Sequence, residues 1–129
     1  CVRVNAHPAG VFELMADPVN LPRWAVGFAK SVEAAEDGAV IVVTGSGDRI
    51  PVQVQSDARS GVIDFVMNPA ADGSATAWAR VVPKGDAAIV TFAQAQPHEM
   101  PDEMFAAQVA AVTHELAVLK AVAEVSCPR

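Results

Sequence analysis

The sequence predicts an α+β domain in which a curved antiparallel sheet packs against one long C-terminal helix. Two observations lead to this prediction. The segment from Pro101 to Val125 has helical periodicity, and much of the preceding chain alternates apolar and polar residues over short runs. A long helix that is apolar on one side needs a surface to cover, and a curved sheet supplies one. With 129 residues, we expect a single domain over 1–129.

The C-terminal helix has the clearest pattern. Pro101 suits a first helical position, and Asp102 and Glu103 suit the first turn, where the helix dipole favours negative charge. Lys120 lies near the other end, where the dipole favours positive charge. The apolar residues recur at three- and four-residue spacing and so share one helix face: Phe105, Val109, Val112, Leu116, Leu119, Val122 and Ala123.

The start of the chain predicts one strand and two short helices. Cys1 to Asn5 alternates two valines with polar residues, as a strand does. Ala9 to Ala16 is typical of a short helix, which Asp17-Pro18 ends. Val19 to Trp24 predicts a second short helical turn, interrupted by Pro22.

From Phe28 the apolar period changes to about two, which predicts about six further strands and about seven in all. Asp37-Gly38 is a strong hairpin signal. We expect loops at 45–48, 69–73 and 83–86, because glycine, proline and polar residues gather there. The expected strands cover 30–36, 40–44, a segment around 52–55, 62–68, 76–82 and 88–94.

Composition limits the class of protein and its partners. Hydrophobic residues make up 52% of the chain and charged residues 19%, so the protein is globular. Nine basic residues stand against fifteen acidic ones, which gives a net charge of −6. Because the basic residues are scattered, we expect no nucleic acid partner and no anionic membrane surface. No apolar run reaches the ~20 residues that span a bilayer, so we also expect no integral membrane association.

The two cysteines lie near opposite termini, at Cys1 and Cys127. Two thiols do not make a disulfide framework, so we expect reduced thiols in a cytoplasmic protein. A disulfide between the two termini is the alternative. A cysteine in first place is also compatible with a processed lipoprotein.

The first third of the chain carries a family resemblance. Val2-Arg3-Val4, followed by Ala6, Pro8, Val11 and Phe12, resembles the opening pattern of the START-like superfamily, also called SRPBCC, which includes polyketide cyclase/dehydrases and birch-pollen-allergen relatives. The segment from Asp17 to Trp24 is similar to that family's Asp-Pro-x-x-x-Pro-x-Trp segment. The layout of the whole chain agrees with the resemblance.

The resemblance implies a helix-grip fold. In that fold a strongly bent antiparallel sheet wraps the C-terminal helix, and an apolar cavity lies between them. Members of the superfamily carry lipids, hormones or polyketides in this cavity. A minority catalyse cyclisation, dehydration or hydrolysis there.

The candidate cavity residues are large apolar side chains and one glutamine: Trp24, Phe65, Met67, Trp78, Phe92, Phe105, Gln108, Val109 and Val112. Ordinary core packing is the alternative for the apolar ones, because Met and aromatic residues are common in cores. The direction of Trp78 is open, since Ala77, Ala79 and Val81 form an equally plausible inward row. Gln108 lies on the flank of the helix's apolar stripe, roughly 60° from its centre, and is our first choice for a polar contact.

Polar strand residues are candidates to orient a ligand inside such a cavity, and an exposed strand face is the alternative for all of them: Arg49, Gln53, Gln55, Asp64, Arg80 and Gln94. Asp64 sits between Ile63 and Phe65. Simple alternation along a strand therefore places it outside.

The sequence contains no recognisable catalytic or metal-binding motif. His7, His98 and His114 lack metal-ligand spacing, and His114 falls opposite Phe105 on the helix, so we expect no metal and no cofactor. Gly45-Ser46-Gly47 lacks the rest of a phosphate loop. No Gly-x-Ser-x-Gly elbow is present. The chain also has no Tyr, which removes one common general acid.

Three functions are compatible with these patterns. The first is binding of a small hydrophobic or amphipathic molecule, lipid- or polyketide-like, in the cavity. The second is a polyketide cyclase/dehydrase-like enzyme, which a buried carboxylate or His with a perturbed pKa beside the cavity mouth favours. The third is a protein-interaction module, which a filled core and a broad exposed apolar patch favour. A homodimer is compatible with the sequence, although no residue requires it.

Overall fold

The computed structural model describes residues 1–35, 39–68 and 75–126. Its helical segments are α1 (Pro8–Ala16), the short 3₁₀ helix η1 (Pro18–Asn20), α2 (Leu21–Trp24) and α3 (Asp102–Ser126). Its strands are β1 (Val2–Val4), β2 (Ser31–Ala34), β3 (Val40–Val43), β4 (Arg49–Asp57), β5 (Val62–Met67), β6 (Ala75–Lys84) and β7 (Ala87–Ala93).

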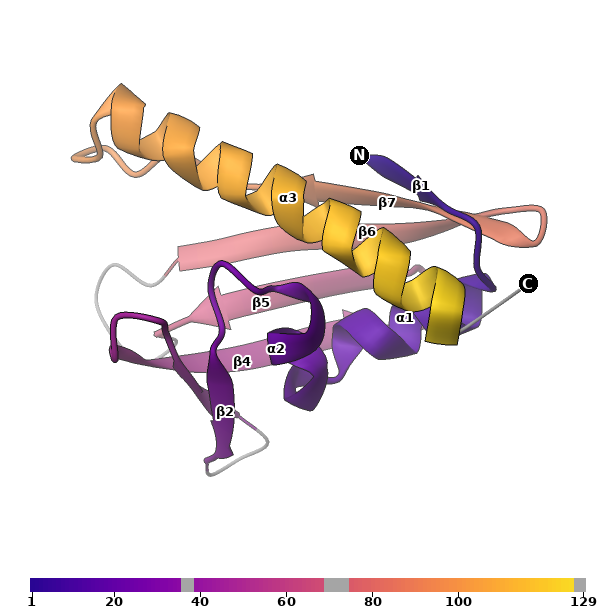
Figure 1. Cartoon of the computed structure of the whole chain (residues 1–129), viewed down its shortest axis with the longest axis horizontal. Helices are drawn as coiled ribbons and strands as arrows, with labels where there is room; N and C mark the ends of the chain where they lie inside the picture. The colour runs from indigo at the N-terminus through magenta and orange to yellow at the C-terminus, as the bar shows by residue number, and fades with distance from the viewer. Residues whose placement is uncertain (36–38, 69–74, 127–129) are drawn as a thin grey trace.

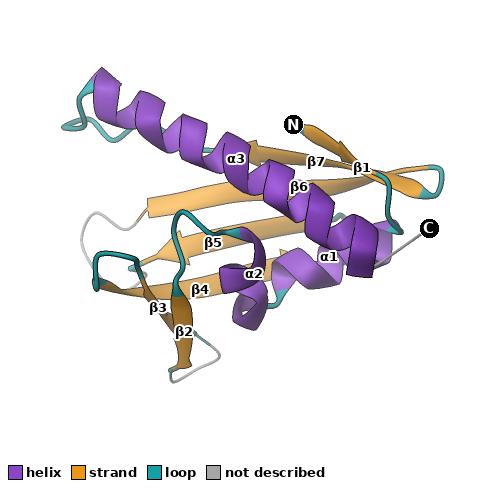
Figure 2. Ribbon diagram, in the orientation of Figure 1, coloured by secondary structure: helices purple, strands orange, loops and turns teal. Residues whose placement is uncertain are grey.

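The strands form one antiparallel sheet in the order β1-β7-β6-β5-β4-β3-β2. The first strand therefore pairs with the last, with Val2 opposite Val90. Figure 1 shows α3 crossing the sheet diagonally, with α1 and α2 on the same side of it. In Figure 2, β2 and β3 run at a steep angle to β5, β6 and β7, so the sheet is strongly bent. This is a helix-grip arrangement, and the predicted fold class is confirmed.

Two capping residues turn the chain from the first strand into the region under α3. His7 caps α1 by accepting a hydrogen bond at Nδ1 from the backbone N–H of Ala9 (3.3 Å). Asp17 ends α1, and its carboxylate accepts from the backbone N–H of Val19 (3.1 Å) to begin η1. The predicted second helical turn is thus split into η1 and α2. This path places Trp24 in the core with 3% of its surface exposed.

The predicted strand boundaries are wrong at the β6–β7 hairpin, and β4 is longer than the predicted segment around 52–55. The sequence predicts a loop at Pro83, but in the structure Pro83 pairs with Ala88 inside the sheet, and Lys84 pairs with Ala87. The turn is therefore only Gly85-Asp86, with Gly85 at φ +63°, as a two-residue hairpin requires. The expected hairpin at Asp37-Gly38 and the expected loop at 69–73 lie outside the described residues.

The long helix is buried along only half of its length. Leu116, Leu119 and Ala123 join the core. Side chains near the C-terminal end of α3 fasten it: Glu124 accepts from the backbone N–H of Asn5 (2.8 Å) and Ser126 accepts from Arg23 (3.3 Å). The N-terminal half stands away from the sheet. In this half the predicted apolar stripe is only partly buried, because the helix crosses above the bent sheet.

α3 is long and apolar enough to cross a membrane by length and composition, with a mean hydropathy of 1.3 over its most apolar stretch. A single such helix is weak evidence, because the core helix of a soluble domain passes the same test. The absence of integral membrane association stays a prediction.

Gly61 provides a test of this fold. Its φ is +73°, and a Cβ at this position would lie 2.1 Å from the carbonyl oxygen of Val81, whose N–H donates to the Gly61 carbonyl (2.8 Å). We expect Gly61→Ala to lower the free energy of unfolding by about 3 kcal/mol or more, because the β5–β6 backbones must separate. Urea-induced unfolding measures this loss, with the dependence of the unfolding free energy on urea concentration expected to be unchanged.

Gly85→Ala is the matched control. Gly85 also has a positive φ of +63°, but a Cβ there meets nothing within 4 Å. It should cost only about 1 kcal/mol, the usual penalty for a left-handed alanine. Equal losses in the two variants would contradict the close approach at Gly61.

Candidate functional site

A cavity of about 410 Å³ lies between the sheet, α2 with the loop after it, and the middle of α3. Small-molecule sites have volumes of about 300–1,000 Å³. The floor consists of inward-facing residues of β4 to β7: Ile50, Val52, Phe65, Met67, Ala77 and Phe92. One wall consists of Leu21, Trp24, Ala25, Gly27 and Phe28, and α3 contributes Gln108, Ala111, Val112 and Glu115. Gln94 continues the floor beyond β7.

Three aromatic rings pack against one another in the cavity lining. Trp24 meets Phe65 edge to face, and Phe65 stacks on Phe92, with ring centroids 6.1 Å apart in both pairs. Such pairs add about 0.5–1.5 kcal/mol beyond their buried area. Trp24 and Phe65 also belong to the buried core, and Phe92 packs against it, so the cavity lining is continuous with the core.

Six of the nine sequence-predicted site residues line this cavity: Trp24, Phe65, Met67, Phe92, Gln108 and Val112. Gln108 lies there on the flank of α3, in agreement with its helical position. It is solvent-exposed, which places it at the mouth.

The other three predicted residues lie elsewhere. Trp78 is on the outer face of the sheet, paired with Asp64 and 44% exposed, because Ala77, Ala79 and Val81 are the inward row of β6. Phe105 and Val109 lie on the N-terminal half of α3, outside both the core cluster and the cavity lining. Val109 is 42% exposed. The predicted helical period is correct, but a period does not reveal where a helix leaves its sheet.

Of the polar candidates, only Gln94 and Gln108 reach the cavity. Gln53, Gln55, Asp64 and Arg80 alternate with inward residues and lie on the outer face. Arg49 forms an exposed ion pair with Glu33 of β2.

Glu115 is the site residue that the sequence patterns do not identify. It is only 7% exposed, and its Oε2 accepts hydrogen bonds from the backbone N–H groups of Gly27 and Phe28, both at 3.1 Å. Burial raises the pKa of this carboxyl above its ordinary value of 4.5, while the two N–H donors and the nearby His114 act to lower it. The sequence signal that could have identified Glu115 is its spacing from Gln108. Glu115 follows Gln108 by two helical turns, so both residues lie on the same flank of α3.

One residue of the cavity lining, Trp24, also carries an unpaired donor. The indole Nε1 of Trp24 is buried, and no acceptor for it exists among the described residues. Leaving a buried donor unpaired costs about 1–3 kcal/mol.

No metal-binding cluster of three or more His, Cys, Asp or Glu side chains occurs within 1–35, 39–68 and 75–126. The described cavity lining also contains no Lys, Arg or His. Glu115 is therefore the ionisable group in the described lining, and its chemistry is that of a hydrogen-bond acceptor or a proton donor.

The sequence matches no protein-family model and no curated protein sequence. Solved structures do share its architecture. One is a START superfamily protein from Mycobacterium smegmatis, 15% identical with a TM-score of 0.67, covering 95% of this chain and 93% of its own. Ara h 8.0201 is 13% identical with a TM-score of 0.68, covering 97% of this chain and 95% of its own.

The third structure is the di-domain ARO/CYC BexL from the BE-7585A biosynthetic pathway. It is 20% identical with a TM-score of 0.71, and the match covers 92% of this chain but 43% of that longer one. These identities are low, so the similarity concerns the fold. The chain has the START-like helix-grip fold that the first third of its sequence resembles.

Glu115 makes stability depend on pH in a defined direction. Because its pKa is raised on folding, the folded state holds the proton at pH values where the unfolded chain has released it. The contribution of Glu115 to the free energy of unfolding therefore falls as pH rises from 4.5 towards the folded pKa. The difference in unfolding free energy between wild type and Glu115→Gln across this window isolates the effect.

Glu103→Gln is the matched control, because Glu103 is an exposed acid on the same helix. Unfolding this variant over the same pH range separates the loss of a carboxyl group from α3 from the loss of the buried carboxyl group. If the wild type instead gains stability over Glu115→Gln as pH rises, the two backbone donors outweigh burial and the pKa of Glu115 is lowered on folding.

Proposed function

We propose that this protein binds a small, mainly apolar molecule in the cavity between its sheet and α3. The observation that supports this most directly is the cavity itself. It is about 410 Å³ in volume and lined by aromatic and aliphatic side chains, with a few polar groups among them. This combination is typical of small-molecule sites.

The position of α3 supplies an entrance. Its first half is exposed, including Met104 at 55%, while Gln94 and Gln108 bring amide groups to the cavity lining. An amphipathic ligand would place its apolar part on the aromatic floor and a polar part near these amides. Lipid-like and polyketide-like molecules both have this character.

We also propose that the protein is soluble and cytoplasmic. The formation of a homodimer stays a prediction.

An enzyme of the polyketide cyclase/dehydrase type is the second candidate, and Glu115 is the observation that favours it. A buried carboxyl with a raised pKa in a cavity is a general acid or base candidate. The enzyme function would be established if the protein turns over reactive poly-β-keto substrates and Glu115→Gln abolishes this turnover while it retains ligand affinity. We rank binding first because Oε2 is already engaged by Gly27 and Phe28.

An interaction module is the third candidate and has less support. The core is not filled. Among the exposed large apolar residues of the described chain, Met104 and Val109 share the N-terminal half of α3, while the others lie on separate elements or loops: Val19, Val26, Trp78 and Val125. A docking patch would require them to be contiguous.

Native mass spectrometry of the purified protein, compared with its denatured mass, tests the proposed function. A mass surplus that disappears on denaturation indicates a non-covalent ligand, and its mass begins to identify the chemical class. The same spectrum gives the oligomeric state. The binding role would be contradicted if the native mass is that of the ligand-free protein and no added apolar molecule increases it.

Ala77→Phe should weaken ligand binding without unfolding the protein. Ala77 lies on the cavity floor opposite Phe65, so a phenyl group there occupies the space that the ligand needs. We expect an affinity loss of about tenfold or more, because displaced apolar contacts are worth about 25 cal/mol per Å². The quenching of tryptophan fluorescence by ligand measures it.

Ala93→Phe is the matched control for this substitution. Ala93 pairs with Trp78 on the outer face of the sheet and is exposed. It should bind ligand as the wild type does. If Ala77→Phe also retains full affinity, the ligand binds elsewhere.

A further inference from the structure

The carboxyl group of Glu115 has one oxygen engaged and one available. Oε2 accepts the backbone N–H groups of Gly27 and Phe28. Oε1 has no hydrogen-bond partner among the described residues, and it is not one of the fully buried atoms there that lack a partner. Because Glu115 lines the cavity, a molecule bound there can approach this accessible oxygen. The two bonds to Oε2 hold the side chain in place and leave Oε1 as an acceptor.

No side chain in the described part of the lining can pair with this carboxyl group as a cation. That part contains no Lys, Arg or His, and the neighbouring His114 is exposed and lies outside it. The net charge of the chain, −6, also attracts cations and opposes anions. A positively charged ligand would therefore supply the opposite charge that the described lining lacks.

An ammonium group matches this acceptor. It has three N–H donors and no acceptor, so one can bond to Oε1 while the amide oxygens of Gln94 and Gln108 are available in the same lining. Burying a charge costs hydration, which the attraction to an opposite charge must offset. The carboxyl group of Glu115 is already largely removed from water in the folded protein. Binding therefore adds mainly the desolvation of the ligand.

The same ion pair forms whichever protonation state Glu115 has in the empty protein. An aliphatic amine holds its proton far more strongly than a carboxylic acid does. A cation beside a carboxyl group favours the ionised form, and so do the N–H groups of Gly27 and Phe28. Any proton that the empty protein holds on Glu115 therefore passes to the solvent when the ammonium group binds.

We propose that the cavity takes a cationic amphiphile, an amine on an apolar body, with the ammonium group on Glu115 and the apolar part against the aromatic floor. This inference rests on the proposed binding function and assigns its ligand class. Neutral alcohols and carboxylates with the same apolar body are the weaker ligands.

Octylamine, octanol and octanoate test the inference, because they share one apolar chain and differ in the end group. Isothermal titration of the full chain near neutral pH gives the three affinities. We expect octylamine to bind at least about tenfold more tightly than octanol. Octanoate should bind most weakly, because its charge would lose hydration without gaining a cationic partner in the described lining.

Glu115→Gln should remove this preference. The amide keeps an oxygen that can accept from Gly27 and Phe28, but it has no negative charge to pair with an ammonium group. The ratio of octylamine affinity to octanol affinity should fall to about twofold or less. If Glu115 only supports the fold, both affinities change together and the ratio stays as in the wild type, which would contradict the inference.

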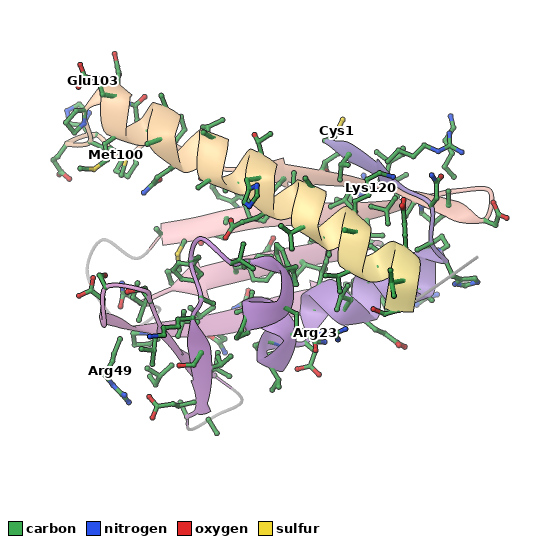
Figure 3. All side chains as sticks on the ribbon, in the orientation of Figure 1. Cys1, Arg23, Arg49, Met100, Glu103 and Lys120 are labelled. Atoms are coloured by element: carbon green, nitrogen blue, oxygen red, sulfur yellow. The ribbon has the colours of Figure 1, made fainter. Side chains whose placement is uncertain are left out.

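Glu103→Gln is the matched control for the loss of charge. It removes a carboxylate from the projecting end of α3, where Figure 3 shows Glu103 pointing away from the sheet. The preference for octylamine should be unchanged.

Ala111→Lys tests the same contact without altering Glu115. Ala111 is exposed, lines the cavity and precedes Glu115 by four residues, a spacing at which opposite charges pair on a helix. The new ammonium group should compete for the carboxyl group and lower the affinity for octylamine about tenfold relative to that for octanol. Ala111→Met adds a side chain of comparable bulk without charge, so it should change both affinities by the same factor.

The outcomes separate the inference from the function on which it rests. Octanol or octanoate binding to the wild type as tightly as octylamine overturns the ligand class and leaves the binding function intact. Failure of all three probes, together with no mass surplus in the native spectrum, overturns the binding function and the inference with it.

Discussion

The structure depends on how one helix covers a sheet that bends away from it. The C-terminal half of α3 packs through Leu116, Leu119 and Ala123, and its end is held to β1 and α2 by hydrogen bonds. A straight helix cannot follow a strongly bent surface along its whole length. Side chains therefore line the apolar space under the first half of α3 without filling it. This unfilled space is the cavity.

Glu115 lies where the packed half of α3 gives way to the open half. Its two hydrogen bonds reach the loop after α2, which carries Phe28 into the cavity wall. One carboxyl group thus connects the helix to the wall opposite the sheet. The cost of burying this group is the same desolvation that raises its pKa. The hydrogen bonds that fasten this part of the cavity wall to α3 are therefore also the hydrogen bonds of a buried ionisable group.

The balance of polar groups distinguishes this cavity from an ordinary packing defect. A defect in a core is lined by apolar atoms and leaves no hydrogen-bonding group unpaired. The residues that line this cavity instead include Trp24, whose buried indole N–H is unpaired among the described residues, and Glu115, whose Oε2 alone is hydrogen-bonded. Unpaired polar groups of this kind are unfavourable in the empty protein and become favourable contacts when a complementary ligand enters.

The sequence alone determined the order of elements, the α+β class and the periodicity of α3, because these follow from local spacing and turn residues. It also identified Trp24, Phe65 and Gln108, whose positions follow from strand alternation, helix geometry and a local motif. The burial of Glu115 and the outward direction of Trp78 depended on tertiary structure. A pattern gives the relative faces of an element, whereas the curvature of the sheet decides which part of each face meets another element. For the same reason Phe105 and Val109, although in register with Leu116, lie beyond the surface that α3 covers.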